Sequence, residues 1–169
     1  MIHAIVYTSQ TGHTKAYAEL LSRLTDIPAY PLSAHPEAKE VVFLGWVRAG
    51  SIVGLGEARK YWKLPCVCAV GMSPGTPELE RELRRNNGVL GEAALFYLQG
   101  GLDLAQLKWP VRLVLAAIAK SARKTLEAKN TRTAAEEQTY RMTLGPYSCV
   151  SEANLADVLA WCRKREQSE

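Results

Sequence analysis

The sequence lacks the features that place a protein across a membrane or direct it out of the cell. Its apolar runs fall short of the roughly 20 residues that span a bilayer. The stretch Met1–Tyr7 has neither the basic region nor the cleavage site of a signal peptide. We therefore expect a soluble, cytoplasmic protein. Because 47% of the 169 residues are hydrophobic, one substantial core is possible, and we expect a single domain over residues 1–169.

The sequence is also poor in metal-ligand and disulfide patterns. It has no CxxC pair, and its three histidines, His3, His13 and His35, form no cluster with metal-ligand spacing, so we expect no metal site. The four cysteines are Cys66, Cys68, Cys149 and Cys162. In a strand, Cys66 and Cys68 would point to one face, which favours a buried structural pair. A redox dithiol is the alternative.

Two phosphate-dependent classes are disfavoured by missing motifs. The chain has no GxxxxGK[ST] motif, the signature of the loop that binds nucleoside triphosphates. No Asp ends the apolar run 41–44, which argues against a phosphorylatable receiver domain. The net charge of +4 favours anionic partners, among them phosphate cofactors, carboxylate-bearing substrates and acidic membrane surfaces. The value is too modest to predict nucleic-acid binding.

Short apolar runs alternate with helical patterns along the chain. Strands are predicted at 2–8, 27–32, 41–45, 64–71 and 93–98, of which the proline-rich run 27–32 suits a sheet edge. One helix follows the first strand, with Ala16, Leu20, Leu21 and Leu24 on one side. Another begins after Thr76 as N-cap, and a third runs from Ser151 to Cys162.

This alternation predicts an α/β fold, a doubly wound five-stranded parallel sheet with helices on both faces. Ligands of such folds bind at the carboxyl ends of the strands, so the loops that follow the strands are the functional candidates. The section from about 104 to 146 exceeds a minimal five-strand unit. We expect an inserted or extended helical segment there.

The loop after the first strand is rich in groups that bind phosphate. It reads Ser9, Gln10, Thr11, Gly12, His13, Thr14. Three hydroxyls and the backbone N–H groups at the start of a helix can converge on a phosphate, and Gly12 lets the backbone approach closely. Without a lysine or a magnesium ligand, the loop suits a monophosphate. The alternative is that these side chains only cap the helix.

The run Ile5–Thr14 resembles the phosphate-binding signature of the flavodoxin family, and this resemblance implies flavin mononucleotide (FMN) as the cofactor. In similar proteins two further loops contact the flavin ring. The corresponding residues here are Gly45, Trp46, Val47, Arg48, Ala49, Gly50 and Ser51 in one loop and Gly71, Met72, Ser73, Pro74 and Gly75 in the other.

Two side chains of the first of these loops have alternative interpretations. Trp46 could stack on the flavin ring or pack in the core. Arg48 could place positive charge near the flavin, bind an anionic substrate, or lie on the surface. No residue is assigned as a catalytic acid or base, and His13 is not expected to be one.

The late helical segment resembles the flavodoxin-domain branch that includes menaquinone-dependent protoporphyrinogen IX dehydrogenase. The likeness starts at Leu98–Asp103 and continues into a basic amphipathic helix at 107–126. Such a helix could make a peripheral contact with a membrane or line a pocket for an acidic substrate such as a tetrapyrrole. The alternative is a helix that packs on the sheet with a solvated basic face.

Three functions follow from these features. An FMN-dependent oxidoreductase that acts on a tetrapyrrole or quinone is favoured, because the net positive charge departs from the acidic character of electron-carrying flavodoxins. The second is an electron-transfer module that exchanges electrons with a redox partner protein or a small-molecule donor. The third is a regulatory or binding domain without flavin.

Overall fold

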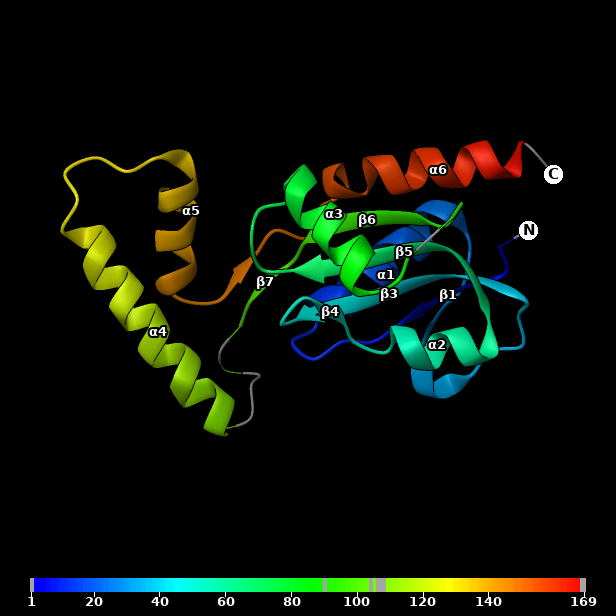
Figure 1. Cartoon of the computed structure of the whole chain (residues 1–169), viewed down its shortest axis with the longest axis horizontal. Coiled ribbons are helices and arrows are strands. Elements are labelled where there is room, and N and C mark those ends of the chain that lie inside the picture. Colours follow the sequence, from blue (N-terminus) through cyan, green and yellow to red (C-terminus); the bar gives the residue numbers. More distant parts are fainter. Residues whose placement is uncertain (1, 90, 104, 106–108, 168–169) are drawn as a thin grey trace. The chain divides into compact units, whose positions relative to one another are not determined.

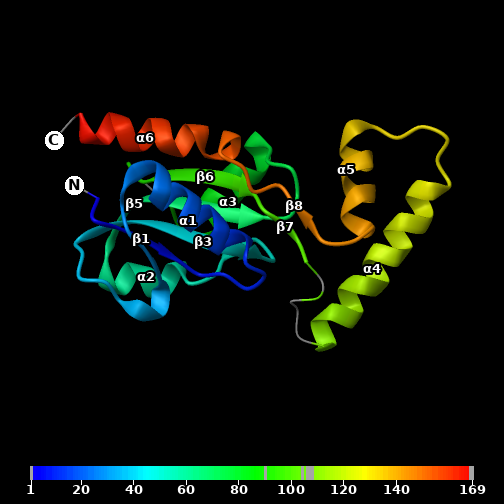
Figure 2. The same ribbon diagram turned by 180° about the vertical axis from the view of Figure 1, so that it is seen from behind.

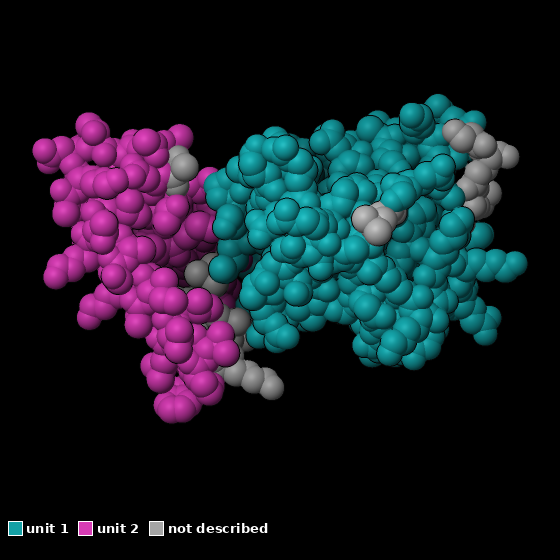
Figure 3. All heavy atoms as spheres, viewed as in Figure 1, with its two compact units in different colours: residues 1–100, 150–169 teal, residues 101–149 magenta. Residues whose placement is uncertain are grey.

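The computed structural model describes residues 2–89, 91–103, 105 and 109–167. The chain divides into two compact units, which Figure 3 colours separately. Unit 1 comprises residues 1–100 and 150–169, and unit 2 comprises residues 101–149. The helical segment expected at about 104–146 falls within unit 2, although residues 104 and 106–108 lie outside the described residues.

Unit 1 is built on a sheet whose five parallel strands run in the order β2-β1-β3-β5-β6 (Figure 1). These strands are β1 (Ala4–Tyr7), β2 (Ala29–Pro31), β3 (Glu40–Arg48), β5 (Lys63–Gly71) and β6 (Ala94–Gln99). A short sixth strand, β4 (Ser51–Ile52), pairs antiparallel with β3. The predicted doubly wound parallel sheet is confirmed, and so is the edge position of the proline-containing strand β2.

Helices cover both faces of this sheet, as Figures 1 and 2 show from opposite sides. They are α1 (His13–Thr25), α2 (Leu55–Tyr61), α3 (Pro77–Asn86) and α6 (Ala156–Glu166), with 3-10 turns at Leu32–Ala34 and Ala153–Leu155. One core cluster joins the sheet to α1 and α6, and the other joins it to α2 and α3. Strands β1, β3, β5 and β6 supply alternate residues to the two clusters, as the period of two requires.

Two local predictions are confirmed by side-chain contacts. The hydroxyl of Thr76 accepts the Leu79 N–H at 3.1 Å and caps α3, which starts at Pro77. Cys66 and Cys68 are both fully buried in the α1/α6 cluster, together with Cys162, and all three are free thiols. Burial raises the pKa of the Cys66 thiol and raises that of Cys162 to about 11. The burial of Cys66 and Cys68 therefore fits the structural interpretation of the pair.

The predicted apolar face of α1 was wrong in part. The helix buries Thr14, Tyr17, Ala18 and Leu21, whereas Leu24 is 38% exposed. The buried face is centred on Tyr17, whose ring lies in the α1/α6 cluster and whose hydroxyl is hydrogen-bonded. A pattern drawn through aliphatic residues alone misses an aromatic side chain that carries a polar group into the core.

The predicted loop at 45–51 was also wrong. Strand β3 continues through Trp46, Val47 and Arg48, and only Ala49 and Gly50 form a turn before β4. Both turn residues have positive φ, 48° and 77°, the conformation of a two-residue type I′ hairpin. Gly45 lies within the strand at a point where a Cβ would be 2.5 Å from Ile52 Cγ2 and 2.8 Å from the Val53 carbonyl oxygen, so only glycine fits there.

Unit 2 contains a helical pair and a short two-stranded sheet. The helices are α4 (Trp109–Glu127) and α5 (Ala134–Thr143), and the strands are β7 (Gly101–Leu102) and β8 (Tyr147–Ser148). Thr133 and Glu136 form a capping box at the start of α5. Helix α4 packs against α5 within unit 2.

Candidate functional site

The carboxyl edge of the sheet has a topological switch point between β1 and β3. From β1 the chain crosses to β2 on one side, and β3, β5 and β6 then follow on the other side. Loops that diverge from neighbouring strands leave a place where a ligand can approach the backbone. The loop from Thr8 to Gly12 starts at this point and leads into α1.

The start of α1 is suited to an anion. Gly12 is the N-cap with φ 86°, a left-handed conformation that favours glycine, and no side chain caps this helix end. The first turn contains no acidic residue. Ser9 and Gln10 are exposed, Thr11 and His13 are half-buried, and Thr14 is only 2% exposed. Backbone N–H groups and hydroxyls at this helix end are the donors that a phosphate needs.

Two side chains of this loop are already linked to each other. The Thr11 hydroxyl and His13 Nδ1 are 3.1 Å apart. His13 also lies beside the end of β6, because a Cβ on Gly100 would be 3.1 Å from the His13 Cβ. His13, the first residue of α1, therefore lies between Thr11 and Gly100.

The hairpin of β3 and β4 occupies the sheet position just beyond β1. The carbonyl of Leu44 accepts the Thr8 N–H, and the carbonyl of Trp46, two residues on, accepts the Val53 N–H at 2.9 Å. Alternate carbonyls of a strand point to the same side. Strand β4 therefore pairs with β3 on the same side as β1 does, beyond the end of β1. The Thr8 hydroxyl donates to the Val53 carbonyl at 2.7 Å and joins the two segments.

The residues that the sequence predicts to contact a flavin ring from the first loop, 45–51, lie on both faces of the sheet. Trp46 is half-buried, and the guanidinium of Arg48 lies over its ring, 5.7 Å from the ring centroid. Alternation from Leu44 puts both side chains on the face that α1 covers. Val47 packs against the cluster on the α2/α3 face. The structure thus brings Trp46 and Arg48 to the same face as the Ser9–Thr14 loop, but not Val47.

The turn of the hairpin is fixed to the end of α3. The Asn87 side-chain amide donates to the Gly50 carbonyl at 2.9 Å, and its carbonyl oxygen accepts the Ile52 N–H at 2.7 Å. Ala49 and Ser51 are exposed. Ala49 and Gly50 therefore serve the hairpin and its anchorage to Asn87.

The second loop that the sequence predicts to contact a flavin ring, Gly71–Gly75, is held by two side chains of β6. The Tyr97 hydroxyl donates to the Ser73 carbonyl at 2.7 Å, and the Gln99 side-chain amide donates to the Met72 carbonyl at 3.2 Å. A Cβ at Gly75 would be 2.9 Å from Tyr97 Cδ1, so this glycine allows the ring to lie against the loop. Burial raises the pKa of Tyr97 to about 12. Met72, Ser73, Pro74 and Gly75 are exposed, while the loop backbone is anchored.

The sequence reasoning missed the residues that support these loops. They are Thr8, Tyr17, Tyr97, Gln99 and Gly100. The Tyr17 hydroxyl donates to the Gln99 carbonyl at 2.6 Å, and the Gly100 N–H donates to the Gly71 carbonyl at 2.7 Å. The available signal was the end of the predicted strand at 93–98, because parallel strands bring their carboxyl ends to one edge.

Comparison with known proteins gives a distant structural likeness. No family model matches the chain, and no curated protein matches it. A solved structure described as a flavodoxin from the domain Archaea is 17% identical, with a TM-score of 0.34. The match covers 59% of this chain and 85% of that one. The flavodoxin-like character of the fold is seen in the strand order itself, and the resemblance to the protoporphyrinogen IX dehydrogenase branch stays a prediction.

Proposed function

We propose that this protein binds FMN at the carboxyl edge of its sheet and uses it in electron transfer. The observation that carries the proposal is the loop Ser9–Thr14, which leaves β1 at the switch point and enters α1 through the left-handed Gly12. This arrangement provides a helix start without a side-chain cap, three hydroxyls and a first turn without carboxylates. An anion with several acceptor oxygens suits these donors.

The residues present fit the phosphate of FMN. The hydroxyls of Ser9, Thr11 and Thr14 and the backbone around Gly12 and His13 would hold it, with Gln10 at the exposed rim. A monophosphate needs no magnesium ion, and the described residues contain no group of three or more potential metal ligands. The pairing of Thr11 with His13 keeps a hydroxyl and an imidazole at this end of the helix.

The flavin ring would lie toward Trp46, Arg48 and the loop Gly71–Gly75. Trp46 offers an aromatic face, and Arg48 a positive charge that stabilises an electron-rich ring or an anionic substrate. The backbone of the Met72–Gly75 segment offers polar groups for the ring edges, and Tyr97 and Gln99 hold this segment in place. Bound FMN supplies one- and two-electron transfer, while the protein supplies binding, orientation and charge.

We propose an oxidoreductase, with a tetrapyrrole or a quinone as the expected substrate class. Arg48, on the same sheet face as the loop, would bind the carboxylates of an acidic tetrapyrrole. The alternative is an electron-transfer module without a substrate of its own. The exposure of Met72, 44%, favours this second function, because an exposed ring loop permits direct electron exchange with a redox partner.

A binding titration tests the cofactor site. FMN and riboflavin, which lacks the phosphate, are titrated against the wild type, Thr11→Ala and Thr14→Ala. Thr25→Ala, at the other end of α1, is the matched control. We expect each loop variant to weaken FMN binding about ten- to a hundredfold, the value of a hydrogen bond to a charged group, and to leave riboflavin binding unchanged. Equal FMN affinity in the wild type and both loop variants would contradict the proposal.

Turnover separates the oxidoreductase from the electron-transfer module. The FMN-loaded protein is assayed with tetrapyrroles, quinones and reduced nicotinamides, in the wild type and in Arg48→Ala. An oxidoreductase with an anionic substrate should show turnover and a raised KM in Arg48→Ala. Stoichiometric electron transfer without turnover would favour the module.

A further inference from the structure

Helix α4 exposes large apolar side chains around much of its first half. Trp109 is 73% exposed, Val114 60% and Ile118 58%, and Val111 and Leu113 are also exposed. Leu126, near the end of the helix, is buried, and α4 packs on α5. A group of large apolar side chains that serves no core marks an interaction surface.

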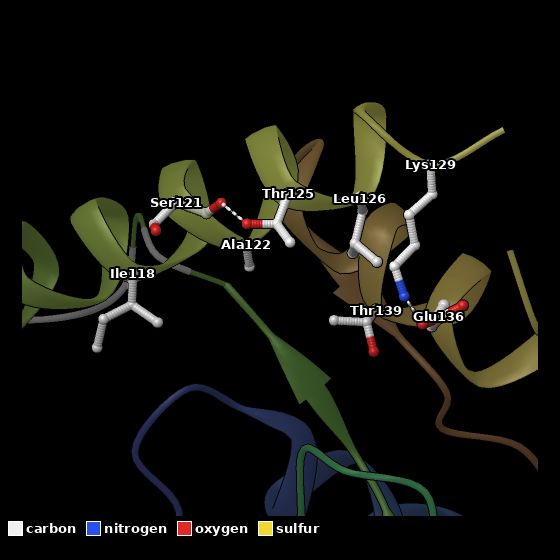
Figure 4. A pocket seen from close by; sticks show the side chains of 8 residues that line it. All are labelled: Ile118, Ser121, Ala122, Thr125, Leu126, Lys129, Glu136 and Thr139. Atoms are coloured by element: carbon white, nitrogen blue, oxygen red, sulfur yellow. Dashed lines mark hydrogen bonds and ion pairs between the residues drawn. The ribbon is translucent and has the colours of Figure 1, made fainter.

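A groove beside α5 extends this apolar surface. It has a volume of about 530 Å³ and is lined on the α4 side by Ile118, Ala122 and Leu126, with the hydroxyls of Ser121 and Thr125 at its wall (Figure 4). Thr139 of α5 lies opposite, and an ion pair between Lys129 and Glu136 lies at one end.

All of the net charge of the protein lies in unit 2. Residues 101–149 contain eight Lys and Arg residues against four Asp and Glu residues, a net charge of +4, while the remainder contains thirteen of each. Three of the four acidic residues are in ion pairs, Glu127 with Arg123, Glu136 with Lys129 and Glu137 with Arg132. The exposed Lys120 and Lys124 therefore give the helix a basic surface that an anionic partner would complement.

The apolar and basic residues are separated along the helix axis. Within α4, residues 109–119 contain one charged side chain, Arg112, whereas residues 120–127 contain three basic side chains and one acidic one. If two copies paired through α4 in parallel, their basic halves would meet. If they paired antiparallel, the apolar half of one would lie against the basic half of the other. This separation argues against a second copy of the chain as the partner.

We propose that α4 docks unit 2 on an anionic lipid surface. Val111, Val114 and Ile118, spaced three and four residues apart and so on one side of the helix, would enter the boundary between headgroups and acyl chains, and the basic residues from Lys120 onward would contact the lipid phosphates. No helix among the described residues is long and apolar enough to cross a membrane. This inference is independent of FMN binding, and the protein without cofactor is sufficient to test it.

Vesicle flotation tests the proposal with the full-length chain. Vesicles of phosphatidylcholine alone are compared with vesicles that also contain phosphatidylglycerol. We expect binding to the anionic vesicles, none to the neutral ones, and release at about 1 M salt, where the Debye length falls to about 3 Å. Val114→Asp, Ile118→Asp and the double variant Lys120→Glu/Lys124→Glu should each weaken binding about tenfold or more.

Matched controls carry the same chemical changes in unit 1. Leu24→Asp introduces an acid at an exposed apolar position, and Lys60→Glu/Arg85→Glu changes the net charge by the same amount as the double variant in α4. Both should bind as the wild type does.

Three results would overturn the proposal. The first is equal binding to neutral and anionic vesicles, and the second is equal weakening by the controls and the α4 variants. The third is absence of vesicle binding, whether or not the protein forms a dimer that the Ile118→Asp substitution dissociates. Circular dichroism of each variant separates loss of binding from loss of folding.

Discussion

The hydroxyl of Tyr17 donates a 2.6 Å hydrogen bond to the backbone carbonyl of Gln99, although 82 residues separate them in the sequence. The same hydroxyl accepts a hydrogen bond from the Asn154 side-chain amide at 2.8 Å. One buried oxygen thus joins α1, the end of β6 and the turn that precedes α6. This contact holds the helix that carries the proposed phosphate loop to the strand whose end supports the second ring loop.

Removal of this hydroxyl should destabilise the whole of unit 1. We expect Tyr17→Phe to lower the free energy of unfolding by about 1–3 kcal/mol, because it leaves a buried carbonyl and an amide without this partner. Urea unfolding measures the change. Tyr30→Phe, an exposed tyrosine on the edge strand, is the control and should cost far less. Equal stability of Tyr17→Phe and the wild type would show that water or a rearrangement replaces the contact.

Tyr97 should make the stability of the protein depend on alkaline pH. Burial raises its pKa to about 12 from the ordinary value of 10.0, so between these values the unfolded chain has lost the proton that the folded chain retains. The contribution is complete below about pH 10 and is lost as the pH rises through about 12. Urea unfolding across this range should show a steeper fall for the wild type than for Tyr97→Phe. Parallel curves for the two proteins would mean that Tyr97 titrates normally in the folded state.

The strands and the doubly wound parallel class of the sheet were predictable because the buried strands are continuous apolar runs in the sequence. Val41–Leu44 and Cys66–Val70 are uninterrupted apolar runs, as buried parallel strands require. The cap at Thr76 was readable for the same reason, since the hydroxyl and the proline that follows it act within one turn. Local signals of this kind need no knowledge of distant contacts.

The features that sequence reasoning missed depend on distant contacts. Gly45 suggested the end of a strand, but β3 continues through it, and the close approach of Ile52 and Val53 explains why glycine occupies this position. The roles of Tyr97 and Gln99 exist only once β5 and β6 are paired. The periodicity of α4 was clear, whereas its partner, α5, could not be inferred from that pattern. The placement of Trp46 and Arg48 on one face of the sheet likewise could not be predicted, because it depends on both residues lying in a strand and not in a loop.

The turn between β3 and β4 contains a residue that is poorly suited to its conformation. Ala49 has φ 48°, where a non-glycine side chain other than Asn or Asp is strained. Asn followed by Gly is the preferred pair in type I′ turns, and Gly50 already occupies the second position. Ala49→Asn should therefore raise the free energy of unfolding by about 0.5–1 kcal/mol, measured by urea titration. Ala49→Val should lower it, and a result in which Val is tolerated as well as Asn would contradict the assigned turn.

Gly100 should connect the stability of unit 1 to the affinity for FMN. A Cβ at this position would be 2.9 Å from Val70 Cγ1 and 3.1 Å from the Cβ of His13, the first residue of α1. Gly100→Ala must displace one of these neighbours, and displacement of His13 moves the start of the helix that would bind the phosphate. We expect a lower melting temperature and weaker FMN binding, measured by thermal unfolding and flavin titration.

The double variant Gly100→Ala/Val70→Ala distinguishes the two displacements. It removes the Val70 methyl groups, so a collision with Val70 alone would be relieved and FMN binding would return to that of Val70→Ala. If the new methyl group displaces His13, the double variant should still bind FMN weakly. Gly56→Ala is the control, because nothing lies within 4 Å of a Cβ there, and alanine in place of this glycine in α2 should be neutral or stabilising. Unchanged FMN affinity in Gly100→Ala would show that the end of β6 does not position the loop between β1 and α1.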